Sequence, residues 1–315
     1  MRQSTRVSIG LPVYNGERFL SSALESILHQ TFRNLEVIIS DNASTDATQA
    51  ICEEYASRDL RVRYHRHERN LGAPANFNRA FQLATSPFFK WMAYDDMLEP
   101  EFVQRCFDAL ARDDSAVLAF SRVVGIDDDG RRTRELPLRV VAMDDPRAHR
   151  RFREIACVRH DAFQLYGLMR RQALADTMLH GHFAAGDKVL LAELALRGRF
   201  IDVPEPLFLL RQHAERGSAT SIYLRSRWHD PDANMRFFFP HWRILSGYVR
   251  AARRAPISMV ERRNCYRALA RLVLVNWNWA RLMTDLLVAA IPSSWRLFER
   301  GRRWMRSRQV RVDKV

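Results

Sequence analysis

Several sequence patterns that identify common classes of binding site are absent from this chain. Its four cysteines, Cys52, Cys106, Cys157 and Cys265, lie far apart and form no CxxC pair. This spacing indicates reduced thiols, and it argues against both a structural zinc site and a disulfide framework. Neither the GxGxxG pattern of Rossmann dinucleotide sites nor the GxxxxGKS/T pattern of the P-loop occurs. A phosphate-bearing ligand must therefore be held in another way.

The chain also has no long low-complexity segment and no sign of a secretion signal. Its 315 residues, 47% of them hydrophobic, are enough for one large domain or for a domain with an appendage. The N-terminal residues are polar and contain no apolar signal region before a strand that is predicted to begin at about residue 7. With the reduced cysteines, this predicts a cytoplasmic location.

Positive charge is concentrated in the last third of the chain. Residues 1–219 contain 30 Lys and Arg against 30 Asp and Glu, whereas residues 220–315 contain 20 against 6, which accounts for the whole net charge of +14. Six of the seven tryptophans also lie in residues 220–315. We therefore predict a folded domain over residues 1–219 and a basic, Trp-rich helical region over residues 220–315.

The N-terminal part alternates predicted strands with predicted helices. Ser44 or Thr45 is expected to cap the second helix. The order strand-helix-strand-helix-strand-helix-strand predicts an α/β fold, in which a mostly parallel, Rossmann-like sheet has helices on both faces. Apolar patterns place strands at residues 7–14, 35–40, 62–64 and 88–94, and helices at residues 19–28, 47–57 and 73–84.

Polar residues follow three of these strands. The carboxyl ends of parallel strands meet at one edge of a sheet, which is where such folds bind nucleotides. We therefore expect these polar side chains to gather in one site. They are Pro12, Tyr14 and Asn15 at the end of the first strand, Asp41 and Asn42 at the end of the second, and Asp95 and Asp96 at the end of the fourth.

The adjacent carboxylates of Asp95 and Asp96 are the most informative of these residues. Two like charges at the end of a buried strand cannot both be buried without a cation, so the pair predicts a divalent metal. The alternative is a solvated turn. A second acidic run, residues 127–129 before Gly130, has the composition of a turn and is predicted to be a solvated hairpin tip.

Four segments resemble the family 2 glycosyltransferases in their order and spacing, and the resemblance extends over about residues 6–216. Members of this family have the GT-A fold and take sugars from nucleotide-sugar donors. The segments are Pro12-Val-Tyr-Asn15, Asp41-Asn-Ala-Ser-Thr-Asp46, Asn70-Leu-Gly72 and Tyr94-Asp-Asp96, followed by Gly186-Asp-Lys188, Gly198-Arg-Phe200, Val203-Pro-Glu-Pro206 and Arg211-Gln-His213.

The resemblance implies a donor site for a nucleotide sugar, most commonly a UDP-sugar in this family. Asp41 would bond the base, and Arg79 and Arg211 would approach phosphate oxygens. The residues lining the base and ribose pocket would be Pro12, Tyr14, Asn15, Glu17 and Asn42.

The resemblance also implies a metal site for Mg²⁺ or Mn²⁺ that joins the acidic pair to the donor diphosphate. His213 would ligate this metal or touch the diphosphate. Many members have Asp-x-Asp-Asp at this motif, but this chain has Ala93 in place of the leading carboxylate. Of the remaining two, we predict Asp96 as the metal ligand and Asp95 as a ribose contact.

The general base implied by the family is Asp187, at the start of a helix predicted over residues 187–196. The simpler alternative is a helix-terminal carboxylate that interacts with the helix dipole. For the acceptor side, Phe163, Tyr166 and Gly167 would form a platform against a sugar ring. Packing into the core is an equally good explanation of these three residues.

The basic region contains an apolar stretch at residues 268–291 that is long enough to raise the question of a membrane span. Arg271, Asn278, Arg281 and Asp285 interrupt it at helical intervals, so we predict one amphipathic helix with a polar stripe. Residues 295–308 combine Arg with Trp, which favours an anionic membrane surface. Packing on the protein and nucleic-acid binding are the alternatives, and nucleic acid is the least favoured.

Together these features predict an inverting, metal-dependent glycosyltransferase that acts on a saccharide or lipid-linked acceptor in the synthesis of a cell-surface polymer. The expected location is the cytoplasm, peripheral on the inner face of the plasma membrane. Two alternatives stay open. One is an inactive sugar-binding or scaffold protein with the same fold. The other is a sugar nucleotidyltransferase, which would usually carry a Gly-rich, basic loop in place of residues 15–18.

Overall fold

The computed structural model describes residues 6–213, 229, 239–275 and 278–291. Within this part of the chain a nine-stranded sheet has the order β3-β2-β1-β4-β8-β6-β9-β5, and β7 pairs with β6 outside this path. The strands are β1 (Val7–Val13), β2 (Leu35–Asp41), β3 (Val62–Arg66), β4 (Phe88–Trp91), β5 (Met97–Leu98), β6 (Ala116–Ile126), β7 (Arg132–Leu136), β8 (Leu168–Arg170) and β9 (Arg199–Arg211).

The N-terminal half of the sheet is parallel, as predicted. β1 lies between β2 and β4, and β3 extends the sheet beyond β2, with all three pairs parallel. In the β1–β2 register Val13 lies opposite Asp41, so the loops after these strands begin side by side. Antiparallel strands enter further on, because β8 pairs antiparallel with both β4 and β6, and β5 with β9.

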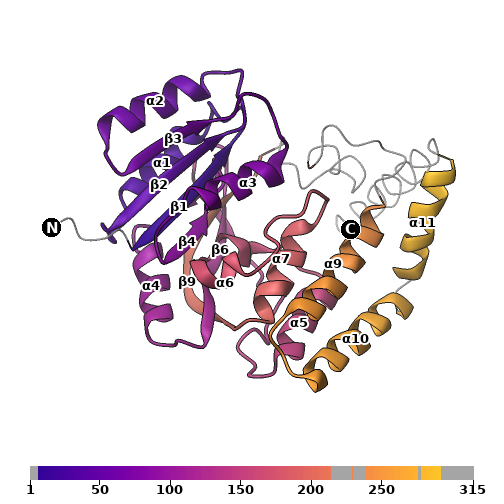
Figure 1. Cartoon of the computed structure of the whole chain (residues 1–315). Helices are drawn as coiled ribbons and strands as arrows, with labels where there is room; N and C mark the ends of the chain where they lie inside the picture. Colours follow the sequence, from indigo (N-terminus) through magenta and orange to yellow (C-terminus); the bar gives the residue numbers. More distant parts are fainter. Residues whose placement is uncertain (1–5, 214–228, 230–238, 276–277, 292–315) are drawn as a thin grey trace, which may run out of the picture.

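Helices cover both faces of the sheet and bury two separate cores (Figure 1). Consecutive strand residues point to opposite faces, so Phe88 of β4 is buried in one core and Phe89 in the other. One face carries α1 (Leu20–Leu28), α2 (Thr48–Arg58) and α4 (Phe102–Ala111), and the other carries α3 (Ala73–Gln82), α5 (Ala148–Cys157) and α7 (Gly186–Ala195).

The described helices of the basic region extend the second core. They are α9 (Pro240–Arg254), α10 (Met259–Leu274) and α11 (Asn278–Ala290). Tyr248 of α9 and Leu269 of α10 are buried in the same core as Phe152 of α5 and Leu190 of α7. Accordingly, α5 and α7 lie between the parallel strands and the C-terminal helices (Figure 1). The predicted boundary at residue 220 lies outside the described residues and stays a prediction.

The prediction of one amphipathic helix over residues 268–291 is wrong. α10 ends at Leu274, and α11 begins at Asn278. Asp285, which was expected in an exposed polar stripe, is buried and accepts the backbone N–H groups of His241 (2.8 Å) and Trp242 (3.1 Å). It therefore caps the free N–H groups at the start of α9.

In the described part of the chain, no helix is both long and apolar enough to cross a bilayer. The Arg- and Trp-rich segment at residues 295–308 lies outside the described residues.

A lysine is buried at the centre of the sheet. Lys90 of β4 is fully buried, and its Nζ donates a hydrogen bond to the carbonyl of Trp91 at 2.9 Å. The ammonium also lies 4.8 Å from the centroid of the Phe102 ring. Burial lowers the pKa of Lys90 to about 7, although Cys106 and Asp96 act in the opposite direction. The charged form therefore destabilises the fold at low pH.

We expect Lys90→Met to be more stable than the wild type by an amount that shrinks as pH rises. Below about pH 7 the lysine is charged in both folded and unfolded chains, so the wild type carries the full burial penalty. Above about pH 7 only the unfolded chain keeps the proton, and the free energy of unfolding of the wild type rises by about 1.4 kcal/mol per pH unit. Urea unfolding at about pH 6 and about pH 9 measures the difference.

The matched control is Arg112→Met, which removes an exposed cation next to α4. Its stability difference from the wild type should stay constant over the same pH range. An equal pH dependence for both variants would contradict the assigned pKa of Lys90.

Candidate functional site

The loops that follow β1 and β2 are bonded to each other at the carboxyl edge of the sheet. Asn15 is central, because its backbone N–H donates to Ser44 Oγ (2.9 Å) and its Oδ1 accepts the N–H of Thr45 (2.9 Å). The N–H of Gly16 donates to Thr48 Oγ1 at 2.8 Å. Asn15 has a φ of 50°, a left-handed conformation that asparagine tolerates better than most residues. The two loops therefore form one unit.

Glu17 and Asp46 complete this unit and cap α2. The Glu17 carboxylate accepts the N–H of Ala47 (2.9 Å), and the Asp46 carboxylate accepts the N–H groups of Glu17 (3.1 Å) and Thr48 (3.0 Å). Burial acts to raise the pKa of Asp46, but the hydrogen bonds from Thr48 and Glu17 outweigh it and lower the pKa. The predicted cap by Ser44 or Thr45 is therefore wrong. These carboxylates satisfy the N–H groups at the start of the helix.

Asp41 is fully buried beneath the loops. One carboxylate oxygen accepts the N–H (2.9 Å) and the hydroxyl (2.6 Å) of Ser44, and the other accepts the Tyr64 hydroxyl (2.8 Å). Burial and the bond to Asp41 raise the pKa of Tyr64, so that phenol stays a donor. Asp41 thus supports the loops from below, and its contact with a nucleotide base stays a prediction.

Asn42 joins the β2 loop to the segment after β3. Its Nδ2 donates to Asn70 Oδ1 (2.8 Å), and its Oδ1 accepts the N–H of Leu71 (2.9 Å). By contrast, the side chain of Tyr14 is 38% exposed and free to meet a ligand from the side of solvent. Of the residues predicted to bind the nucleotide, Tyr14 is thus accessible to a ligand, while the Asn42 side chain is used to hold two loops together.

The two adjacent carboxylates after β4 have different surroundings. Asp96 is 1% exposed, and its Oδ1 accepts the backbone N–H of Arg211 at 2.9 Å. Asp95 is less buried, and its Oδ2 lies 3.0 Å from Nε2 of His213. Nδ1 of His213 is buried and has no protein hydrogen-bond partner among the described residues. The geometry therefore favours Asp95, rather than Asp96, as the carboxylate that shares a ligand with His213.

Arg211 connects the end of β9 to this acidic turn. Its buried guanidinium donates to the backbone carbonyls of Asp95 (2.8 Å), Asp127 (2.9 Å) and Asp128 (2.8 Å). A phosphate contact by Arg211, as predicted, would require some of these bonds to be exchanged. The acidic run at residues 127–129 forms the turn between β6 and β7, which confirms the predicted hairpin.

Asp187 lies in the first turn of α7, after a loop that is tied to α3. Asn78 of α3 accepts the N–H of His180 at 3.0 Å and donates to its carbonyl at 3.0 Å. The His180 ring packs edge-on against Trp91, 4.8 Å between centroids. Burial lowers the pKa of His180 to about 4, although the charge of Asp187 acts against this. The Asp187 loop is thereby held next to the end of β4.

The predicted acceptor platform is largely part of the core. Tyr166 stacks on Phe208 with centroids 5.3 Å apart and planes 11° from parallel, and Phe163 packs partly buried against the same core. A side chain at Gly167 would come within 2.5 Å of the Ala119 carbonyl oxygen. These contacts favour the packing explanation, and a role in acceptor binding stays a prediction.

Arg79 is exposed at the end of α3, on the β3 side of the site. Burial lowers the pKa of His67, and the charge of Arg79 lowers it further.

The Asn78–His180 connection was missed from the sequence, since it joins residues 102 positions apart and no local pattern marks it.

Residues 8–178, more than half of the chain, match the family model for glycosyl transferase family 2. The chain belongs to this family. It is 35% identical over 124 residues to the chondroitin synthase of Escherichia coli, covering 39% of this chain and 18% of that protein. It is 31% identical over 102 residues to the glycosyltransferase GlyA of Streptococcus pneumoniae, covering 32% of this chain and 14% of that protein. The chain thus spans well under two thirds of the length of each of these relatives.

Solved structures show the same fold at low sequence identity. S. aureus TarS residues 1–349 in complex with UDP superimposes with a TM-score of 0.62 at 16% identity, over 86% of this chain and 72% of that chain. The mannosyltransferase PcManGT of Pyrobaculum calidifontis, solved with GDP-Man and Mn²⁺, gives 0.57 at 17% identity, over 95% and 80%. The GT-A-type fold expected for the family is therefore confirmed.

We expect Asn78→Ala to lower sugar transfer at least about tenfold while nucleotide affinity changes by less than about twofold, because a small displacement of a catalytic group is costly. The variant loses both bonds that hold the Asp187 loop on α3. Initial rates and calorimetric titration of nucleotide measure the two effects. Gln82→Ala, an exposed amide on the same helix, is the matched control. Transfer at the wild-type rate in Asn78→Ala would contradict this role.

Proposed function

We propose that this chain is an inverting glycosyltransferase that moves a sugar from a nucleotide diphosphate to an acceptor hydroxyl. The contact between Asp95 and His213 carries the proposal, because it brings a carboxylate and an imidazole together at the carboxyl edge of the sheet. The bonded loops after β1 and β2 lie at this edge too. TarS is known with UDP and with UDP-GlcNAc, and PcManGT with GDP-Man.

The residues at the end of β4 fit a divalent metal, Mg²⁺ or Mn²⁺. Carboxylate oxygen and imidazole nitrogen suit Mn²⁺, and a site with few protein ligands is usual where substrate phosphates complete the coordination. Asp95 and His213 would hold the ion, with Asp96 buried behind them. The described residues contain no group of three His, Cys, Asp or Glu side chains placed for a metal, so the proposed site has two protein ligands. When bound, the ion neutralises charge on the leaving diphosphate.

The bonded loops form the nucleotide site in this proposal. Tyr14 and Pro12 border the base, with Asp41 and Asn42 beneath it and Asn15 and Glu17 shaping the loop around it. UDP is the nucleotide proposed for this site, because TarS, a structural relative, is solved with UDP and UDP-GlcNAc. Arg79 is exposed, and it supplies a cation for the diphosphate.

Asp187 acts as the general base. Its carboxylate takes the proton of the acceptor hydroxyl while that oxygen forms a bond to the anomeric carbon. The bond from the anomeric carbon to the diphosphate oxygen breaks on the opposite side, and the nucleoside diphosphate leaves with the electron pair. Attack opposite the leaving group inverts the anomeric configuration.

The acceptor is a saccharide or a lipid-linked saccharide in cell-surface polymer synthesis, and the basic C-terminal region brings the enzyme to an anionic membrane. A chondroitin synthase among the relatives supports a polysaccharide product. The competing proposal is an inactive nucleotide-sugar-binding protein, which Ala93 in place of a motif carboxylate favours.

Asp187→Asn separates these two proposals. In a transferase, removing the base should lower the transfer rate by about 10²–10⁴-fold. Nucleotide affinity should stay unchanged, since Asp187 is not among the donor residues. Initial rates with a radiolabelled UDP-sugar and a saccharide acceptor, together with calorimetric titration of UDP, measure both quantities. Asp144→Asn, an exposed carboxylate in the loop before α5, is the control and should transfer normally. Equal rates in both variants would contradict the role of Asp187.

His213→Gln tests the metal site without an activity assay. Loss of the imidazole should weaken Mn²⁺ binding in the presence of UDP at least about tenfold. Even the loss of a residue that only hydrogen-bonds to a metal ligand typically weakens metal binding by about this much. Electron paramagnetic resonance of free Mn²⁺ measures the affinity. His65→Gln, on β3, is the matched control and should bind Mn²⁺ like the wild type. Unchanged binding in His213→Gln would exclude His213 as a ligand.

A further inference from the structure

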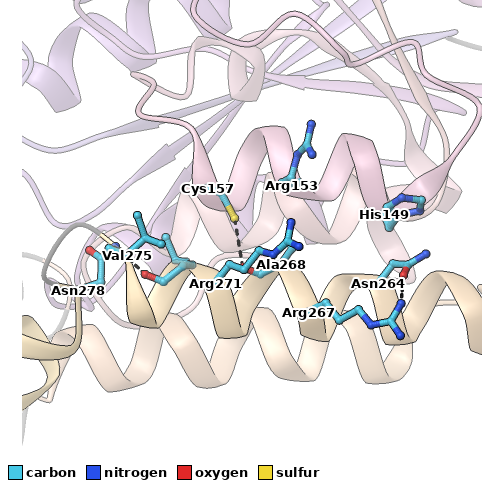
Figure 2. Close-up of a pocket in the computed structure, with 10 residues that line it drawn as sticks. His149, Arg153, Cys157, Asn264, Arg267, Ala268, Arg271, Val275 and Asn278 are labelled. Atoms are coloured by element: carbon cyan, nitrogen blue, oxygen red, sulfur yellow. Dashed lines mark hydrogen bonds between the residues drawn. The ribbon is translucent and has the colours of Figure 1, made fainter.

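A cavity of about 450 Å³ lies between α5 and α10 (Figure 2). None of its lining residues belongs to the loops after β1, β2 or β4. We call it the α5–α10 groove. It is lined by His149, Arg153 and Cys157 of α5, by Asn264, Arg267, Ala268, Arg271 and Leu272 of α10, and by Val275 and Asn278 where α10 gives way to α11.

The groove is positively charged. Arg153, Arg267 and Arg271 are all exposed, and Figure 2 shows Arg153 on α5 and the other two on α10. The adjoining carboxylates do little to offset them. Glu261 is engaged by His149 at 2.7 Å, and Glu154 only approaches Arg153, at 4.0 Å. Three guanidiniums around one cavity provide the planar donors that phosphate oxygens accept.

The groove ends next to an exposed apolar surface. Val275 lines the groove, is 53% exposed, and follows Leu274, which is 75% exposed. Large apolar side chains then recur on α11 at intervals of three and four residues, so they share one face of this helix. α11 buries its other face, with Leu282, Asp285 and Val288. The exposed members are Trp279, Met283, Leu286 and Leu287 of α11, and Ile291 directly after it.

We propose that the α5–α10 groove binds the phosphate of an anionic membrane lipid, while the exposed apolar face of α11 enters the bilayer interface. The membrane association proposed above would then be mediated by these particular side chains. Lipid binding at this groove does not depend on how the nucleotide sugar is bound. A helix that lies in the interface buries its apolar face among acyl chains and keeps cations near the head groups. Arg267 and Arg271 next to Leu274 and Val275 have this arrangement.

Charge complementarity and apolar exposure together select a membrane over other polyanions. A nucleic acid or a soluble phosphate would satisfy the three arginines, but it would leave the apolar face of α11 in water. Exposed apolar patches of this extent mark protein or membrane contacts. A bilayer of anionic phospholipid satisfies both features with one partner.

Sedimentation of the full chain with vesicles tests the proposal. The probes are vesicles of phosphatidylcholine alone and vesicles of phosphatidylcholine with phosphatidylglycerol in equal parts. Wild type should bind only the anionic vesicles. Loss of one cation near such a surface costs about fivefold in affinity, so Arg267→Ala with Arg271→Ala should weaken binding roughly thirtyfold. Leu286→Asn with Leu287→Asn should also weaken it at least about tenfold, since two apolar side chains leave the interface.

Arg263→Ala is the matched control, because it removes an exposed cation from α10 that does not line the groove. It should change affinity less than about twofold, and far-ultraviolet circular dichroism should show all variants folded. An equal loss of vesicle affinity in Arg263→Ala and in the groove variants would contradict a specific lipid site in the groove and would indicate non-specific electrostatic attraction to the membrane. Two results would contradict both lipid binding in the groove and the membrane association. One is the absence of vesicle binding. The other is binding to a DNA duplex that is tighter than binding to vesicles and is unchanged by the substitutions at Leu286 and Leu287.

Discussion

The candidate site depends on one buried cation. The guanidinium of Arg211 lies where three chain segments meet, and its bonds to the carbonyls of Asp95, Asp127 and Asp128 join the end of β9 to the acidic turn and to the β6–β7 hairpin. Its own backbone N–H holds Asp96. Buried carbonyls left without donors are costly, so Arg211 compensates several groups at once. It also begins the segment that brings His213 against Asp95.

The carboxylates after β4 can differ in function because their surroundings differ. Asp96 is buried and bonded to the chain, which fixes the turn, whereas Asp95 meets His213 at a less buried position. The loops after β1 and β2 are fixed in a similar way, by bonds between each other. Asn78 then ties the Asp187 loop to α3. The proposed donor site and the proposed base are thus supported by separate sets of hydrogen bonds.

Local patterns predicted much of this fold, and contacts distant in sequence explain the rest. The end of β2 at Asp41, the hairpin at residues 127–130 and the start of α7 near Asp187 each follow from apolar periodicity or turn composition, whereas β4 ends at Trp91, earlier than the predicted residue 94. The inward direction of Arg211 does not follow from such patterns, because its acceptors lie in the loops after β4 and β6, far along the chain. Asp285 was misassigned for the same reason. Helical spacing placed it on a polar stripe, whereas its partners are the N–H groups of α9, 43 and 44 residues away.

The central claim is that the carboxyl edge of this sheet binds a nucleoside diphosphate together with a divalent metal. Calorimetric titration of UDP, GDP and dTDP into the full chain, with Mn²⁺ and again with EDTA, tests it most directly. We expect UDP to bind more tightly than the other two nucleotides, and EDTA to weaken the binding of UDP greatly. Absence of binding by every nucleotide in the presence of Mn²⁺, or equal binding of UDP in EDTA, would contradict it.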